Sequence, residues 1–308
     1  MNNRLILRIL FSLIIATTLS FLGCKSNGSI SEPIIYGEHY LPRWTSNIQL
    51  TYSTVYDFNQ DNRIYETEHF LIFSDAADDE TKIQFAEMGE RAYKELKELF
   101  NISEAKNFTI NSMNPLTKIQ IICNKNDPRS QKSYPYGFML YTLDSRYCFA
   151  TEENIFREVK HELTHVFQMY LDGSSRRYLY GWFREGLAEF AADGGFFPQI
   201  LSLSDFIRAQ NLLDGLGIHP LKIPWSDLNV IPSEYHYAIY SMSGLAMRYL
   251  LDPKGCGKSI TNIKDIFSAL KQNTSLPFES AFENNTGISI HQFEDDFYDN
   301  MMIYLSPN

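Results

Sequence analysis

Positive charge is in short supply in this sequence. Of its 308 residues, 27 are Lys or Arg and 37 are Asp or Glu, which gives a net charge of −10 at pH 7. Proteins that bind nucleic acid or adhere to anionic lipid headgroups need a basic surface to do so. We therefore expect no nucleic-acid partner and no electrostatic attachment to a membrane. The charge leaves the substrate of an enzyme open.

Cysteine is also scarce, and no C-x-x-C occurs among the four: Cys24, Cys123, Cys148 and Cys256. Their spacing is not that of a structural zinc site, and the three besides Cys24 permit at most one intrachain disulfide. The sequence contains no internal repeat, no phosphate-binding Walker loop, no G-x-S-x-G and no dinucleotide-binding fingerprint.

Long hydrophobic runs are limited to one, residues 9–22, which follows Arg4 and Arg8. A basic start followed by a short apolar run is typical of a signal peptide, and this run is short for a membrane span. The remaining residues, about 285, are enough for one large domain or two lobes with a real core.

The end of this run, Phe-Leu-Gly-Cys at residues 21–24, resembles a bacterial lipobox. The resemblance implies that residues 1–23 are a lipoprotein signal peptide and that Cys24 carries a lipid anchor at the mature N-terminus. It implies a location at the bacterial cell envelope, on the periplasmic or cell-surface side. Residues 24–50 would then form a tether and N-terminal extension. Ordinary secretion and a retained signal anchor are the alternatives.

The segment His-Glu-Leu-Thr-His at residues 161–165 lies inside a predicted helix over residues 152–171. Four residues advance a helix by about 400°, so His161 and His165 lie one above the other on the same face. Two imidazoles at that spacing can bind one Zn²⁺, and Glu162 is close enough to reach a water at the metal.

A catalytic zinc usually takes three protein ligands, and the segment Trp-Phe-Arg-Glu-Gly-Leu-Ala-Glu-Phe at residues 182–190 offers the third. Nineteen residues separate His165 from Glu185. That is enough for the first helix to end, for a loop to turn back, and for a second helix to present Glu185. The alternative for the whole constellation is a buried helix whose histidines only satisfy hydrogen bonds.

H-E-L-T-H followed by W-F-R-E-G-L-A-E-F resembles the gluzincin metallopeptidases, the thermolysin-like peptidase MA group. The resemblance implies one zinc ion per chain on His161, His165 and Glu185, with Glu162 as the general base that activates water against a peptide bond. The substrate would be a peptide or protein. The fold implied is α+β with two lobes: an N-terminal mixed sheet with the active-site helices at residues 51–200, and a C-terminal helical lobe at residues 201–308.

Apolar spacing predicts strands and one long helix ahead of the zinc motif, and mainly helices behind it. Residues 79–100 form the first long helix, with a core face of Phe85, Met88, Ala92, Leu96 and Leu99. The expected strands are residues 69–72, 119–122, 137–142 and 146–150. The other expected helices are residues 204–213, 235–251, 262–272 and 289–304. In gluzincins an exposed sheet edge beside the zinc binds extended peptide, and residues 137–142 or the strand after them are the expected edge.

Residues 57–62 lie between two strand-like runs and predict a hairpin loop. A calcium loop is the alternative, because four oxygen-bearing residues match its ligand positions: Asp57, Asn59, Asp61 and Glu68. Asn62 stands where such a loop has glycine, and its flanks are not helical, so the hairpin is the simpler interpretation.

Two further residues are candidates for supporting roles. Glu189, four residues after Glu185 on the same helix face, resembles the acidic position that accepts the free N–H of a ligand histidine; a solvated carboxylate is the alternative. Aligning residues 248–250 with the family pattern makes Tyr240 a candidate donor to the oxyanion. Tyr237 and a protonated His236 are alternative donors, and aromatic core packing is the other interpretation.

Two other functions use the same features. One is a catalytically inactive, zinc-stabilised surface lipoprotein that binds a partner. The other is a zinc amidase that acts on a non-peptide amide. An intact Glu162 argues against the first, because a binding module needs the histidines at most. The sequence leaves the cleavage preference and the oligomeric state open.

Overall fold

The computed structural model describes residues 51–54, 63–74, 79–102, 118–124, 132–134, 137–141, 152–172, 179–193, 199–222, 231–232 and 235–306. All of these fall in one compact unit, Tyr40–Asn308. The expected signal peptide with Cys24, the tether, the possible calcium loop at residues 57–62 and the expected strand at residues 146–150 lie outside the described ranges. Within those ranges, no helix combines the length and apolar character needed to cross a bilayer.

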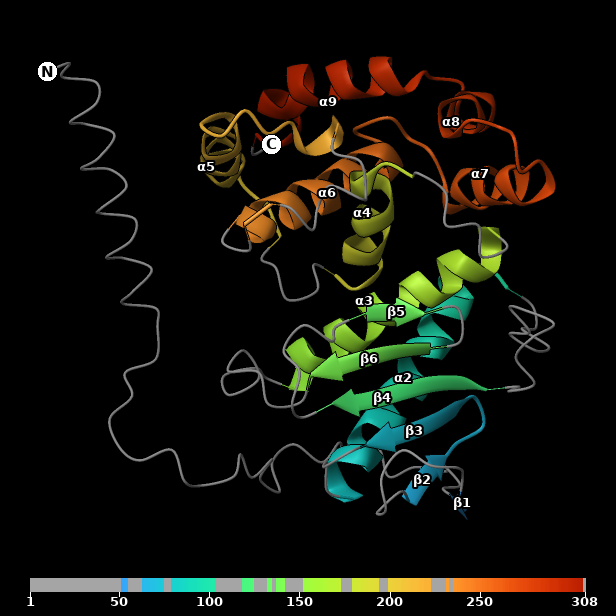
Figure 1. Ribbon diagram of the computed structural model, residues 1–308. Helices are drawn as coiled ribbons and strands as arrows, with labels where there is room; N and C mark the ends of the chain where they lie inside the picture. Colours follow the sequence, from blue (N-terminus) through green and yellow to red (C-terminus); the bar gives the residue numbers. More distant parts are fainter. Residues whose placement is uncertain are drawn as a thin grey trace, which may run out of the picture. The chain divides into compact units, whose positions relative to one another are not determined.

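A six-stranded mixed sheet occupies one part of this unit (Figure 1). Its order is β1-β2-β3-β4-β6-β5. β1, β2 and β3 pair antiparallel, β4 pairs parallel with β3 and with β6, and β5 pairs antiparallel with β6. The strands are β1 (Thr51–Thr54), β2 (Arg63–Glu66), β3 (Phe70–Ser74), β4 (Ile119–Asn124), β5 (Lys132–Tyr134) and β6 (Gly137–Tyr141).

The expectation that residues 137–142 form an exposed edge is wrong. β6 lies inside the sheet, because β5 pairs along its outer side in the register Lys132↔Met139 to Tyr134↔Gly137. The sequence did not predict β5, because a strand of three residues is too short to show a recognisable alternation of apolar and polar side chains. Among the described strands, β5 and β1 are the sheet edges.

Two long helices pack on the sheet and on each other: α2 (Asp79–Leu99) contacts β2, β3 and β4, and α3 (Glu152–Asp172) contacts β5 and β6. Both lie behind the strands in Figure 1. Four of the five predicted core residues of α2 are buried, whereas Leu99 is half-buried and Phe100 is fully buried beside it. The periodicity of this helix was therefore predicted correctly almost to its end.

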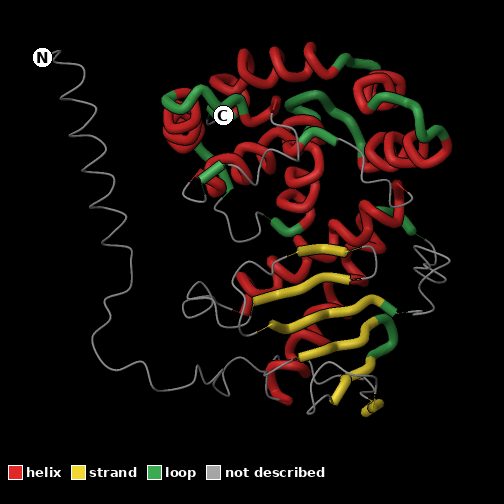
Figure 2. Tube along the Cα trace, viewed as in Figure 1, coloured by secondary structure: helices red, strands yellow, loops and turns green. Residues whose placement is uncertain are grey.

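The remaining elements are helical and gather apart from the strands (Figure 2). They are α4 (Gly181–Ala191), α5 (Leu203–Asp214), the short 3-10 helix η2 (Pro220–Lys222), α6 (His236–Leu251), α7 (Ile260–Gln272), α8 (Phe278–Thr286) and α9 (Ile290–Tyr304). Ser289 caps α9 by accepting a hydrogen bond from the Gln292 amide at 3.1 Å. The sequence did not predict α8. A mixed sheet covered by α2 and α3, together with a group of helices apart from the strands, makes the fold class α+β, as predicted.

The aromatic pair at the start of α4 fixes this short helix among the C-terminal helices. Trp182 and Phe183 are fully buried. Trp182 stacks on Phe293 of α9 with ring centroids 4.7 Å apart, and Phe183 meets Phe278 of α8 at 4.9 Å. This packing anchors the helix that carries Glu185 and Glu189.

Candidate metal centre

α3 presents its two motif histidines from a buried helix face. His161 and His165 are 6% and 4% exposed, and their Nε2 atoms are 3.2 Å apart. The one-turn spacing therefore places both imidazoles at one point, as the sequence predicts. Two nitrogens this close repel unless a proton or a cation lies between them.

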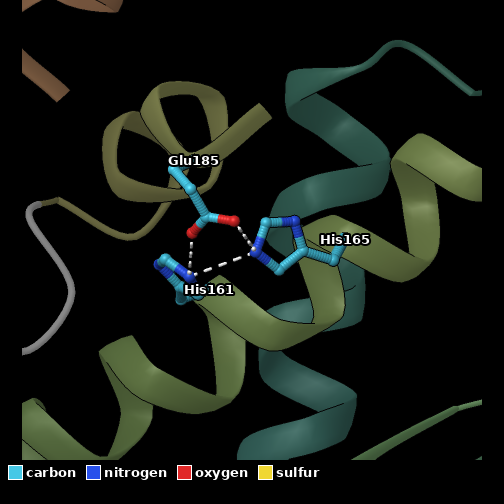
Figure 3. Close-up of side chains that lie close together, drawn as sticks. All are labelled: His161, His165 and Glu185. Carbon is cyan, nitrogen blue, oxygen red and sulfur yellow. Dashed lines mark hydrogen bonds and ion pairs between the residues drawn. The ribbon is translucent and has the colours of Figure 1, made fainter. Parts of the chain in front are cut away.

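α4 brings a carboxylate to the same point (Figure 3). Oε2 of Glu185 is 3.2 Å from Nε2 of His161, and Oε1 is 3.3 Å from Nε2 of His165. Glu185 is 1% exposed. Its Oε1 has no hydrogen-bond partner among the described residues, although it is within ion-pair distance of His165. A buried carboxylate is stabilised by a nearby positive charge, which either a protonated histidine or a bound metal ion can supply.

The three donors fit a tetrahedral metal ion. With metal–nitrogen and metal–oxygen bonds of about 2.0–2.2 Å, neighbouring ligand atoms in a tetrahedron lie about 3.3–3.5 Å apart. In the site the two Nε2 atoms are 3.2 Å apart, and each lies close to a different oxygen of Glu185, at 3.2 Å for His161 and 3.3 Å for His165. With one donor atom taken from each residue, the three atoms lie within 4.8 Å of one another. Two imidazoles and one carboxylate are also a common donor set for catalytic zinc. The buried cluster of His161, His165 and Glu185 can hold a metal ion.

Each histidine has a side-chain partner for its other ring nitrogen. Nδ1 of His161 lies 2.9 Å from Oε1 of Glu189, which is buried and not solvated. Nδ1 of His165 lies 3.1 Å from Oε1 of Gln168, and the amide nitrogen of Gln168 donates to the Arg184 carbonyl at 2.8 Å. Both outer partners leave Nε2 directed at the cluster. The sequence pointed to Glu189 but not to Gln168, although its position three residues after His165 was a usable signal.

The charges of the cluster depend strongly on one another. Burial lowers the pKa of His161, but hydrogen bonds and charges from Glu185 and Glu189 outweigh it and raise the pKa well above its ordinary value. Burial disfavours the ionised form of Glu185, yet the charge of His165 and the close contacts with both histidines hold its pKa well below the usual range. Burial raises the pKa of Glu189, against the opposing effect of His161. These shifts favour a proton on His161 in the absence of metal, and a metal ion would compete with that proton.

A close approach between two backbones places the acidic helix. A Cβ added to Gly186 would lie 2.3 Å from the carbonyl oxygen of Ser243 on α6, and one added to Gly244 would lie 3.0 Å from Cβ of Glu189. Glycine at both positions allows α4 and α6 to touch at the level of Glu185 and Glu189. Sequence reasoning missed this contact because its partners are far apart in the chain.

The predicted catalytic residues lie on α3 and α6. Glu162 is 8% exposed. The ring of Tyr240 is 6.2 Å from the ring of His161, centroid to centroid. Burial, followed by the charges of Glu185 and Glu162, raises the pKa of Tyr240 well above its ordinary value, so its hydroxyl stays protonated. Its predicted core neighbours Met242 and Ala246 are fully buried.

The two alternative donors are placed differently. Tyr237 is 36% exposed. Nε2 of His236 lies 2.9 Å from the Ile231 carbonyl oxygen and is therefore engaged in a hydrogen bond with it. The centroid of the His236 ring lies 6.1 Å from that of the Tyr240 ring. Of the three candidates, Tyr240 has the direct ring contact with a cluster histidine.

Neither a family model nor a curated protein matches this sequence. The geometry of the cluster and the resemblance of its two motifs are therefore what bear on function.

Proposed function

We propose that this protein is a zinc-dependent peptidase of the gluzincin type. The observation that carries the proposal is the convergence of three buried side chains, His161, His165 and Glu185, whose donor atoms, one from each, lie within 4.8 Å of one another. The two motifs that supply these residues are those that resemble the gluzincins. The proposal includes the corresponding fold, in which a sheet-bearing lobe and a helical lobe flank the metal.

The roles follow from what each residue can do at the cluster. His161, His165 and Glu185 would hold the zinc ion, which would supply a Lewis acid for the substrate carbonyl and lower the pKa of water toward about 7. The Glu162 carboxylate takes a proton from the attacking water and passes it to the leaving amine. The neutral hydroxyl of Tyr240 donates a hydrogen bond to the carbonyl oxygen as negative charge develops there.

The edge of the sheet nearest this site gives the substrate a place to bind. β5 is an edge strand, and it packs against α3, the helix that carries the histidines. An extended peptide can pair with such an edge through main-chain hydrogen bonds, which suits substrates that differ in side chain. We therefore assign peptide binding to β5 in place of residues 137–142.

Digestion of an unbiased peptide library tests the proposal. The wild-type protein should cleave peptides, and a chelator should abolish the cleavage. Glu162→Gln should retain the metal and lose turnover by several orders of magnitude, because it removes the proton acceptor but no ligand. Glu294→Gln, which changes a glutamate that is 2% exposed on α9, serves as the matched control and should cleave normally.

Each other outcome has a definite meaning. A zinc-loaded protein that cleaves no peptide but hydrolyses non-peptide amides would identify a zinc amidase. A zinc-loaded protein that hydrolyses neither would identify an inactive binding module. Full activity of Glu162→Gln would contradict the role given to that residue.

We also propose that the protein is a lipoprotein of the bacterial cell envelope, anchored through Cys24. The basic start, the short apolar run and Gly23-Cys24 support this. Mass spectrometry of the membrane-extracted protein should find an acylated Cys24 as its first residue. An unmodified protein in the medium, unaffected by Cys24→Ala, would indicate ordinary secretion instead.

A further inference from the structure

A histidine ligand must carry its N–H on the nitrogen that faces away from the metal. A neutral imidazole has one N–H, and either ring nitrogen can hold it. For His165 to bind a cation through Nε2, the hydrogen has to be on Nδ1, so whatever faces Nδ1 must accept a hydrogen bond. Gln168 is the residue that faces it, at 3.1 Å.

A glutamine amide can present either an acceptor or a donor, and its surroundings decide which. The other end of the Gln168 amide lies 2.8 Å from the carbonyl oxygen of Arg184. That carbonyl can only accept, so the NH₂ group must face it and the amide oxygen must face His165. Gln168 is 2% exposed, so water does not compete for either contact. The backbone of α4 thus fixes the orientation of a side chain on α3.

The two histidines differ in this respect. His161 has a carboxylate, Glu189, at Nδ1, and a carboxylate is an acceptor in any orientation. His165 has a neutral amide, which accepts only because Arg184 holds it in place. Arg184 directly precedes Glu185, so the contact that orients Gln168 depends on α4 being correctly positioned. The neutral amide also adds no further negative charge beside Glu185 and Glu189.

We propose that Gln168 is a positioning residue that selects the tautomer of His165 with its hydrogen on Nδ1 and so prepares Nε2 for the metal. The role rests on the proposed zinc site for its purpose. In the metal-free protein Oε1 of Glu185 lies 3.3 Å from Nε2 of the same ring and competes with Gln168 for the hydrogen, so the tautomer reports which acceptor holds it. Gln168 touches neither substrate nor reacting atoms in this account.

Three variants test the role. Gln168→Met keeps the length of the side chain and removes the acceptor; Gln168→Glu keeps an acceptor toward His165 and loses the donor toward Arg184. Gln84→Met is the matched control, since Gln84 is a 4% exposed glutamine on α2 whose amide nitrogen has no hydrogen-bond partner among the described residues. Zinc affinity is measured by competition with a chelator. The tautomer of His165 is measured by nitrogen NMR on the labelled, metal-free protein.

We expect Gln168→Met to weaken zinc binding by about 10- to 100-fold, as loss of an outer partner does, and to lose the preference for Nδ1–H at His165. Gln168→Glu should restore both to within about tenfold of wild type, and Gln84→Met should change neither. Unchanged zinc affinity or tautomer in Gln168→Met would overturn the proposal, as would equal losses in Gln168→Glu. If the wild-type protein binds no zinc, the proposed function fails, and the NMR measurement still decides the role of Gln168.

Discussion

α3 and α4 hold the residues of the candidate site by different means. α3 has 21 residues and packs against α2, α7 and the strands β5 and β6 through ordinary side chains. α4 has 11 residues, of which nine are buried, and it meets the backbone of α6 through Gly186. The histidine pair needs only one helical turn to form, whereas Glu185 and Glu189 reach it only if α4 lies directly against α6.

The two helices differ in how easily a shift disrupts the site. Local spacing on α3 survives small shifts of the helix, because both histidines move together. A shift of α4 separates Glu185 from the histidines and Glu189 from His161. We therefore expect α4 and its contact with α6 to be the more sensitive of the two.

The largest effect is expected from Gly186→Ala. The added Cβ would lie 2.3 Å from a backbone oxygen, so α4 must move away from α6. We expect loss of zinc binding and a destabilisation of about 1–3 kcal/mol, as overpacking produces. Gly89→Ala is the matched control on α2, because its Cβ would meet side chains and no backbone: the end of Ile121 at 2.9 Å and the ring of Phe70 at 3.3 Å. Zinc affinity is measured by competition with a chelator. Equal affinities in the two variants would contradict the claim that the contact of α4 with α6 is the sensitive part of the site.

Tyr240→Phe should lower turnover by about 10²- to 10³-fold with zinc content intact, because it removes one donor to the oxyanion. Peptide hydrolysis and metal analysis on the same preparation measure both quantities. The comparison variants are Tyr237→Phe and His236→Ala, which we expect to retain activity. If turnover survives Tyr240→Phe and collapses in either of the others, that residue is the donor.

Glu189→Ala should weaken zinc binding by about 10- to 100-fold without removing a ligand, since the Nδ1–H of His161 loses its acceptor. Competition with a chelator gives the value. Glu294→Ala removes a glutamate with the same 2% exposure on α9 and should leave the affinity unchanged. Equal affinities for the two variants would mean that α4 contributes Glu185 alone.

The smallest effect expected is a pH dependence. His161 has a pKa raised well above the ordinary 6.5, so zinc must displace its proton, and affinity should rise by about tenfold per pH unit until the pH passes that pKa. In the metal-free protein the sign is opposite. The raised pKa stabilises the fold fully below pH 6.5, and this contribution is lost as the pH rises through the pKa of His161 in the folded state. Thermal unfolding with and without zinc measures both trends, and a zinc affinity independent of pH would contradict them.

The difference between the helices also explains what the sequence could predict. The pairing of His161 with His165 and of Glu185 with Glu189 follows from spacing within each helix, and the core face of α2 follows from the same period. The burial of the site residues, their pKa shifts and the contact of Gly186 with Ser243 depend on residues far apart in the chain. No local sequence pattern predicts them. β5 escaped prediction because three residues carry too little alternation, and its absence led to the wrong sheet edge.

Metal analysis of the purified protein tests the central claim most directly. We predict one zinc ion per chain in the wild type and none in the double variant His161→Ala, His165→Ala. The control is the double variant His219→Ala, His291→Ala, which removes two exposed histidines and should keep its zinc. Full zinc in the first double variant, or none in the wild type, would contradict the assignment of His161, His165 and Glu185 as a metal site.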